Sequence, residues 1–353
     1  MNSTVILNIS LVVMYQTNVT TSHSFGEKIN YPQAIISLVQ TIIALIAIAA
    51  FFRACIRQSG PWSPFTSYAI CIVLGDLMFT FYNVLLTIQL FVGYWPFSER
   101  SCSVMLFLVY GGGLVVLYGE LLIAINRIWA VYAPLHYRTH HTKRLAWLLN
   151  GVLWLLAMTF IVPFIALDDV YRTRKSIVCT ADSKAHPVYT LVGRAVFHLP
   201  VFLIPIICVF LVLRRRQRAK VRVTSNAVSL RTVSSRHNGI PNTSVMHEEN
   251  RVPAVRLSNC VRSSIMVRRT NSTKNLAVLA WVALNVVVFW GPTTTYQLLF
   301  SVASHLVPYS PGVLSWVTTW NFFSHCSGPF LLLFTVLRST NSRARPQRNA
   351  TRN

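Results

Sequence analysis

Long apolar runs separated by short polar segments dominate the sequence. Seven of these runs have about 20 or more residues, the length that an α-helix needs to cross the hydrocarbon layer of a membrane. They cover residues 33–52, 66–92, 104–131, 145–167, 188–213, 275–302 and 311–337. Residues 275–337 contain no Asp, Glu, Lys or Arg, and this stretch is long enough for two crossings. The pattern therefore predicts an all-α membrane protein, a bundle of seven transmembrane helices.

The overall composition agrees with lipid as the solvent for most of the chain. Hydrophobic residues make up 53% of the 353 residues and charged residues 12%, whereas soluble domains carry about 25% charged residues. The net charge of +23 would by itself suit a protein that binds nucleic acid. The charge-free stretch of residues 275–337 excludes a soluble basic protein. We therefore expect a lipid membrane, and no nucleic acid, as a partner.

The placement of the basic residues predicts the orientation in the membrane. Loops on one side hold 25 of the 32 Lys and Arg residues, loops on the other side hold six, and Arg194 lies within the fifth run. Because basic loops stay in the cytoplasm, we expect a multi-pass plasma-membrane protein with its N-terminus outside and its C-terminus in the cytoplasm. Glycosylation sequons at Asn2, Asn8 and Asn18 agree with this orientation, although sequons also occur on the predicted cytoplasmic side.

The chain is predicted to consist of one membrane domain with three polar attachments. Residues 1–32 form an extracellular tail, in which a short apolar stretch is interpreted as tail rather than as a cleaved signal peptide. Helices one to five with their loops occupy residues 33–213, and helices six and seven occupy residues 275–337. Residues 214–274 form a long basic third cytoplasmic loop, which lacks aromatic residues and is expected to be largely disordered. Residues 338–353 form a basic cytoplasmic tail.

The arginine clusters at the ends of the third cytoplasmic loop have two interpretations, which are compatible. They can hold the chain against anionic lipid headgroups, or they can contact a signalling partner.

Prolines and tryptophans interrupt the predicted helices. A proline inside a helix removes a backbone hydrogen bond and kinks the helix. The sixth run contains Phe289, Trp290 and Pro292, which predicts a hinge with a large aromatic side chain two residues before the proline. Further interruptions are Trp154 and Pro163 in the fourth run, Pro205 in the fifth, and Gly328 with Pro329 in the seventh.

Further short motifs occur along the predicted helices, and Arg127 follows Cys102 by 25 residues. The motifs are Leu74-Gly75-Asp76 in the second helix, Trp95 and Phe97 before Cys102, Asn126-Arg127-Ile128 in the third helix, Trp154, Pro205, and Phe289-Trp290-x-Pro292. In these motifs and in the spacing from Cys102 to Arg127, the chain resembles the rhodopsin-like (class A) family of G-protein-coupled receptors over residues 66–337.

The resemblance implies three sites. Cys102 and Cys179, both on the predicted oxidising side, would form the disulfide of the family. Asn126, Arg127 and Ile128, followed by Pro134, would form the switch that meets a heterotrimeric G protein. The third site would be a toggle in helix six, formed by Phe289, Trp290 and Pro292.

The departures from the family pattern carry predictions of their own. Helix seven has Gly328-Pro329-Phe330-Leu331-Leu332 where the family has Asn-Pro-x-x-Tyr, which puts the usual rearrangement there in doubt. Asn126 replaces the acid that usually neighbours Arg127, and Ser272 stands where some relatives have a glutamate. With both restraints missing, we predict a weaker resting state and raised basal signalling.

Three ionisable residues lie inside the predicted helices, where a charge costs about 2.5–3.5 kcal/mol on insertion scales. They are Asp76, Glu120 and Arg194. By resemblance Asp76 belongs to a sodium pocket, but its expected neighbours, Val116, Ser324, His325 and Gly328, supply few oxygens. Either His325 pairs with Asp76 in place of the ion, or a weakened sodium site remains.

Glu120 lies two helical turns before Arg127. It either accepts a hydrogen bond from Asn285 of helix six or is a protonated residue packed in the bundle.

The resemblance also implies a ligand pocket in the outer half of the bundle. Arg194 and His198 share a face of helix five at a spacing of four residues, so the guanidinium could bind an acidic ligand group. It could instead pair with an aspartate of the outer loop or reach the membrane surface. Glycines 111–113 could widen the pocket or let a helix approach closely. The implied pocket residues are Val109, Gly113, Arg194, Phe197, His198, Thr293, Tyr296, Gln297, Thr318 and Phe322.

The identity of Val109 disfavours an amine ligand, because amine receptors of the family carry an aspartate there. No lysine in helix seven is available for a retinal Schiff base. Peptides, lipids, acidic metabolites and chemosensory cues remain as ligand classes.

A membrane transporter without G-protein coupling is the alternative function. However, three buried charges at different depths make a poor path, and no internal repeat supports this alternative. An enzyme is not expected, because the sequence shows neither a nucleophile with its base nor a metal-binding cluster such as H-E-x-x-H. No cofactor is expected either.

Overall fold

The computed structural model describes residues 30–57, 63–171, 179, 192–214, 217, 279–302 and 310–350. The predicted outer tail with its three sequons and most of the predicted third cytoplasmic loop lie outside these residues. The chain divides into two compact units, Ile206–Ala280 and the rest. The packing described below lies within the larger unit.

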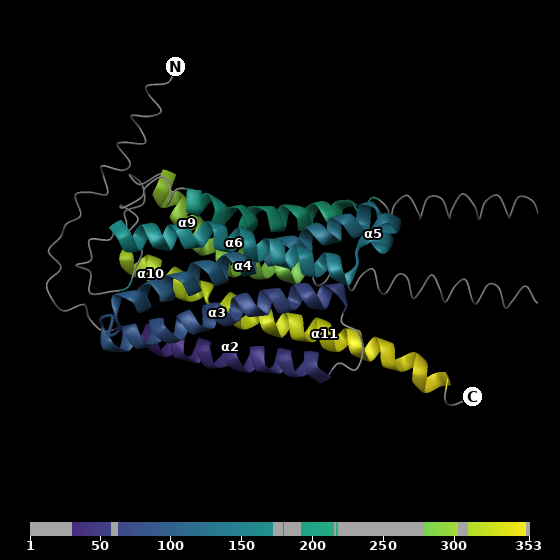
Figure 1. Ribbon diagram of the computed structural model, residues 1–353, viewed down its shortest axis with the longest axis horizontal. Coiled ribbons are helices and arrows are strands. Elements are labelled where there is room, and N and C mark those ends of the chain that lie inside the picture. Colours follow the sequence, from purple (N-terminus) through teal and green to yellow (C-terminus); the bar gives the residue numbers. More distant parts are fainter. Residues whose placement is uncertain are drawn as a thin grey trace, which may run out of the picture. The chain divides into compact units, whose positions relative to one another are not determined.

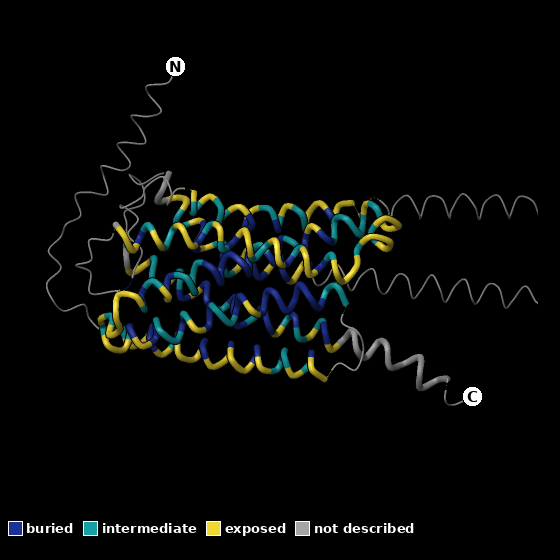
Figure 2. The backbone as a smooth tube through the Cα atoms, in the orientation of Figure 1, coloured by how far each residue is buried: buried dark blue, intermediate teal, exposed yellow. Residues whose placement is uncertain are grey.

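The described residues form helices and their connections (Figure 1). The first five predicted transmembrane runs correspond to helices that are long and apolar enough to cross a membrane. Their outward side chains are apolar, as lipid requires, and Figure 2 shows exposed residues along the outer side of α2. These helices are α2 (Tyr31–Arg57), α3 (Pro64–Val92), α4 (Glu99–Tyr132), α6 (Lys143–Tyr171) and the helix Val192–Arg214.

Helices six and seven depart from the predicted single spans. A π-helical turn, η2 (Val286–Trp290), precedes α9 (Gly291–Val302), and both lie in the sixth run. The seventh run is divided at Phe322 into α10 (Pro311–Asn321) and α11 (Phe323–Ala350). Helix α11 continues beyond the predicted end of this apolar run at residue 337, as far as Ala350.

A short additional helix, α5 (Pro134–His140), lies in the segment predicted as an intracellular loop. Pro134 begins it, at the position where a proline ring fits a helix because no N–H is needed there.

Glycines set the crossing of α3 and α4. A Cβ on Gly112 would lie 2.9 Å from the backbone oxygen of Gly75 and 3.1 Å from the backbone nitrogen of Phe79. A Cβ on Gly75 would in turn lie 2.9 Å from Cγ2 of Val116. These distances are shorter than ordinary van der Waals contact, so the two backbones approach closely only because both positions lack a side chain. Of the two uses considered for the glycines 111–113, close approach therefore applies to Gly112.

Candidate functional site

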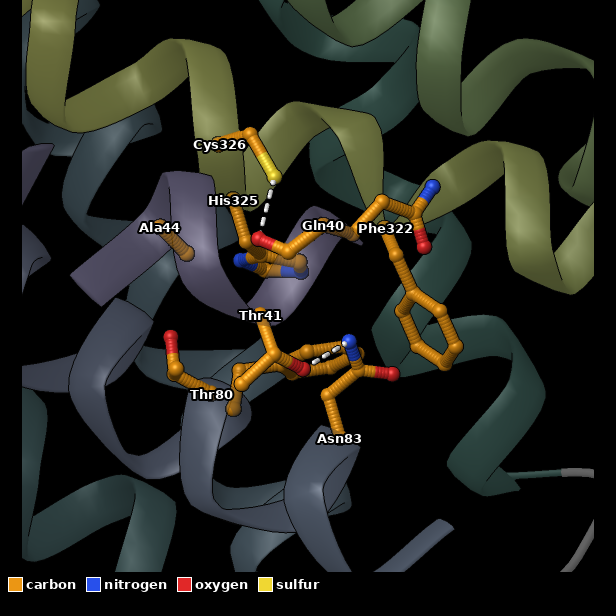
Figure 3. A pocket seen from close by; sticks show the side chains of 9 residues that line it. Gln40, Thr41, Ala44, Thr80, Asn83, Phe322, His325 and Cys326 are labelled. Atoms are coloured by element: carbon orange, nitrogen blue, oxygen red, sulfur yellow. Dashed lines mark hydrogen bonds between the residues drawn. The ribbon is translucent and has the colours of Figure 1, made fainter. Parts of the chain in front are cut away.

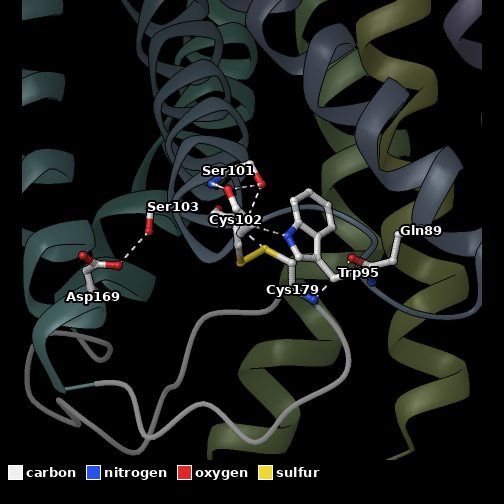
Figure 4. Close-up of a disulfide and its surroundings, with 8 residues drawn as sticks. Gln89, Trp95, Ser101, Cys102, Ser103, Asp169 and Cys179 are labelled. Carbon is white, nitrogen blue, oxygen red and sulfur yellow. Dashed lines mark hydrogen bonds between the residues drawn. A yellow bond between two sulfur atoms is a disulfide. The ribbon is translucent and has the colours of Figure 1, made fainter.

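A disulfide joins Cys102, in the first turn of α4, to Cys179, with their Cα atoms 5.6 Å apart (Figure 4). This confirms the predicted pair. The backbone N–H of Cys179 donates to Oε1 of Gln89 on α3, at 3.3 Å. The indole N–H of Trp95 donates to the carbonyl oxygen of Ser98, at 3.1 Å. Cys179 is therefore held against the end of α3 and the start of α4. We call this end of the bundle the disulfide end.

Asp76 and His325 form a buried pair between α3 and α11. Nδ1 of His325 lies 2.8 Å from Oδ1 of Asp76, and both residues are at most 3% exposed. The ring of Phe79 stacks on the imidazole, with centroids 3.7 Å apart. The predicted contact between Asp76 and His325 is therefore present. Two further expected neighbours, Val116 and Gly328, bring no side-chain oxygen to this place.

The geometry around Asp76 fits the histidine better than a sodium ion. A hard cation needs several oxygen ligands, and the side-chain oxygen of Ser324 already accepts a hydrogen bond from Trp290. Oδ2 of Asp76 is buried and has no hydrogen-bond partner among the described residues. One orphan carboxylate oxygen does not make a cation site.

A chain of polar contacts connects Trp290 to Glu120. The indole N–H of Trp290 donates to Oγ of Ser324 at 3.0 Å. The hydroxyl of Ser327 reaches both the carbonyl oxygen of Ser324, at 3.1 Å, and Oδ1 of Asn285. Nδ2 of Asn285 donates to Oε1 of Glu120 at 3.5 Å, so the predicted contact between these two residues is also present. We call these five residues the polar relay; it joins η2, α11 and α4.

Aromatic rings surround Gly113 beside the relay. A Cβ on Gly113 would lie 3.4 Å from Phe197, 3.4 Å from Phe79 and 3.5 Å from Trp290. The ring of Phe322 packs edge-on against Phe79, with centroids 5.3 Å apart. The structure therefore brings together three of the predicted pocket residues, Gly113, Phe197 and Phe322, next to the predicted toggle. Phe79 belongs to this cluster and was not predicted.

Several predicted pocket residues instead connect helices α9 and α10. The hydroxyl of Thr293 donates to the carbonyl oxygen of Val317 at 2.9 Å. The hydroxyl of Tyr296 donates to the carbonyl oxygen of Ser310 at 3.2 Å. The hydroxyl of Thr318 donates within its own helix, to Leu314. The remaining predicted pocket residues lie on α4, on the helix Val192–Arg214 and on α9, and they are Val109, Arg194, His198 and Gln297.

A small cavity lies between α2, α3 and α11 (Figure 3). Of the predicted pocket residues, only Phe322 lines it. Two of the polar residues around it, Gln40 and Thr41, come from α2, which sequence reasoning did not consider. A signal was present, since α2 carries buried polar residues on one face at helical spacing. They are Gln33, Ser37, Gln40 and Thr41, which bond to residues of α3 and α10 such as Asn83 and Thr319.

The hydrogen bond that Pro292 removes from helix six is replaced by a residue that the sequence did not reveal. Pro292 has no N–H, so the carbonyl oxygen of Val288, four residues earlier, lacks its usual helical partner. The indole N–H of Trp320 on α10 donates to this oxygen at 2.9 Å. The π-helical turn η2 lies directly before this point, and such turns are frequent at functional sites. The hinge predicted at Pro292 is therefore tied to α10 by Trp320.

Arg127 lies near the end of α4 that is opposite to the disulfide, and we call this the arginine end. Its Cζ lies 5.5 Å from the ring centroid of Phe65 on α3. Asn126, which replaces the acid of the family, donates to the carbonyl oxygen of Leu122 in its own helix, at 3.1 Å. Ile128 follows in the same helix. Ser272, the second predicted departure at this site, lies outside the described residues.

Comparisons with known proteins place this arrangement in a family. The family model described as 7 transmembrane receptor (rhodopsin family) matches residues 29–332. The chain therefore belongs to the rhodopsin family of seven-transmembrane receptors, and its fold is the seven-helix bundle of that family.

Individual relatives are distant and match only in part. The human muscarinic acetylcholine receptor M1 is 28% identical over 139 residues, which cover 38% of this chain and 30% of the relative. The C5a anaphylatoxin chemotactic receptor 1 of Rattus norvegicus is 25% identical over 193 residues, which cover 51% of this chain and 52% of the relative. The chain thus matches about a third to about half of the length of these relatives.

Proposed function

We propose that this protein is a plasma-membrane receptor that binds an extracellular ligand and activates a heterotrimeric G protein. The observation that carries the proposal is the polar relay from Trp290 to Glu120. Glu120 lies seven residues before Arg127, two turns along the same helix. The relay therefore connects the aromatic cluster around Gly113 with the helix that bears Arg127. Family membership gives the same class of protein.

The proposed mechanism is a bending of helix six at Pro292. In the proposed orientation the disulfide end is extracellular and the arginine end cytoplasmic. A ligand that contacts the aromatic cluster displaces Trp290 and weakens its bond to Ser324. The segment around Pro292 then pivots, and contacts on the cytoplasmic side of the hinge, such as that of Asn285 with Glu120, rearrange. The ligand shifts an equilibrium between closed and open faces that exists without it.

The ligand is proposed to be other than a biogenic amine. One relative is named for acetylcholine and another for the C5a anaphylatoxin, so the relatives alone do not select a class. Val109 supplies no anion for an ammonium group, whereas Arg194 and His198 add donors and positive charge to the helix Val192–Arg214. A peptide, a lipid, an acidic metabolite or a chemosensory cue remains the proposed class.

A ligand screen tests the proposal. Cells that express the protein with a set of chimeric G proteins would be exposed to peptides, fatty acids and small carboxylic acids, and nucleotide exchange would be measured. We expect dose-dependent exchange for one class, lost in Arg127→Ala at equal surface expression. Uptake of a compound without exchange on any G protein would show a transporter and refute the proposal.

A further inference from the structure

The side chain of Arg127 has an aromatic partner where the family pattern would provide a carboxylate. The distance of 5.5 Å from Cζ to the Phe65 centroid lies within the range of a cation–π contact. The amide N–H of Asn126 donates to the backbone of its own helix. Within the described part of the chain, Arg127 forms no ion pair. The ring of Phe65 is thus a side-chain contact of Arg127 on α3.

The position of Phe65 is fixed by the start of α3. Ser63 caps this helix: its side-chain oxygen accepts from the backbone N–H of Thr66 at 3.2 Å. Pro64 occupies the first position of the helix, where its fixed backbone angle favours the helical turn. A capped, proline-initiated turn presents the next residue, Phe65, in a defined direction. The contact with Arg127 is therefore a property of the fold of α3 and not of a mobile loop.

A second aromatic residue of α3 holds the segment that contains α5. The hydroxyl of Tyr68 lies 3.0 Å from Nε2 of His141. The imidazole of His141 stacks on Tyr137 of α5, with ring centroids 4.5 Å apart, and packs edge-on against Trp129 of α4 at 5.8 Å. Tyr68 thus ties α5 to α3 through one hydrogen bond, one turn beyond Phe65.

We propose that Phe65 and Tyr68 are positioning residues, which hold Arg127 and α5 in the resting arrangement in place of the missing ion pairs. This proposal rests on the proposed function. Arg127 must leave the Phe65 ring before it can contact a G protein, so the loss of the ring favours the active arrangement. The hydroxyl of Tyr68 limits the movement of α5 in the same way.

Basal nucleotide exchange at equal surface expression tests the role of Phe65. Phe65→Leu removes the π face, and we expect it to raise basal exchange about two- to fivefold, the effect of losing one partly exposed cation–π contact on an equilibrium. Phe65→Tyr keeps the π face and should match the wild type. Phe81→Leu, on the exposed side of the same helix, is the matched control. Equal or lower exchange in Phe65→Leu than in Phe81→Leu would overturn the proposal.

A measurement without a G protein tests the role of Tyr68. A spin label on Leu135→Cys of α5, which is 80% exposed in the native protein, reports the mobility of this helix in the purified protein. Tyr68→Phe should increase the mobility of the label, and an unchanged spectrum contradicts the tie. A failure of this proposal can be distinguished from a failure of the proposed function. If no variant and no G protein gives exchange, the proposed function fails, while the spin-label result still decides the tie.

Discussion

The crossing of α3 and α4 gives a prediction whose size follows from the structure. In Gly112→Ala the new Cβ would lie 2.9 Å from the oxygen of Gly75 and 3.1 Å from the nitrogen of Phe79. Both are backbone atoms, which cannot rotate away, so the helices must separate. Overpacking of this kind costs about 1–3 kcal/mol, whereas alanine in a helix regains about 1 kcal/mol relative to glycine. For a backbone clash we take the upper half of the range and expect a net loss of about 1–2 kcal/mol.

Thermal denaturation of the purified protein measures this loss, with Gly151→Ala as the control. A Cβ on Gly151 of α6 meets no atom within 4 Å, so this variant should gain about 0.5–1 kcal/mol from backbone entropy alone. The denaturation midpoint should fall for Gly112→Ala and rise for Gly151→Ala. If both midpoints move in the same direction by the same amount, the close approach of the two backbones does not determine the packing.

Three further predictions concern single contacts. Because His325 lies against the carboxylate of Asp76, we expect the denaturation midpoint to be the same in sodium and potassium chloride; a sodium-specific rise that disappears in Asp76→Ala would refute the pairing in place of an ion. Trp320→Phe leaves the oxygen of Val288 without its donor and should lower the midpoint, by the equivalent of about 1–3 kcal/mol; an unchanged midpoint would show that the bond is dispensable. Burial and the positive charge of Arg127 lower the pKa of His141 from its ordinary 6.5. Because folding then favours the neutral imidazole, stability should stay constant above the unfolded pKa and fall as the pH drops below about 6.5, and it should fall less in His141→Asn.

The sequence predicts the transmembrane helices well, because lipid imposes one simple rule. A segment that crosses the membrane must satisfy its own backbone hydrogen bonds, so a long apolar run can only be a helix. The breaks were less predictable. Phe322 divides the seventh run although nothing in its local sequence favours a break there. The sequence also did not predict that the last helix continues to Ala350. Polar residues beyond residue 337 end the apolar pattern, but they do not end the helix.

Contacts within the bundle were predictable where a charged or polar residue had few possible partners. Asp76 and Glu120 each needed a polar neighbour in a membrane, and the structure provides His325 and Asn285. The donor to the carbonyl oxygen of Val288, which Pro292 leaves without a helical N–H, was not predictable in this way. This acceptor is a backbone oxygen, so any nearby donor could serve. Trp320 is the donor because α10 places its indole N–H beside this oxygen.

The pocket was predicted only in part, for a related reason. The rings of three other helices lie around Gly113, where an added Cβ would meet them at 3.4–3.5 Å. The threonines and the tyrosine of α9 and α10 were expected to face a ligand, yet their hydroxyls have backbone oxygens within reach. Helical spacing identifies the face on which a residue lies, and it does not show whether the side chain is already satisfied.

Basal nucleotide exchange is the most direct measurement of the central claim, because it needs no ligand. Membranes from cells that express the protein with a panel of chimeric G proteins would be compared with membranes of untransfected cells. The account predicts exchange above background for at least one G protein, a decrease in Asn126→Asp, which restores a carboxylate beside Arg127, and loss in Arg127→Ala. Exchange at background for every G protein, in the wild type and in Phe65→Leu alike, would contradict the account.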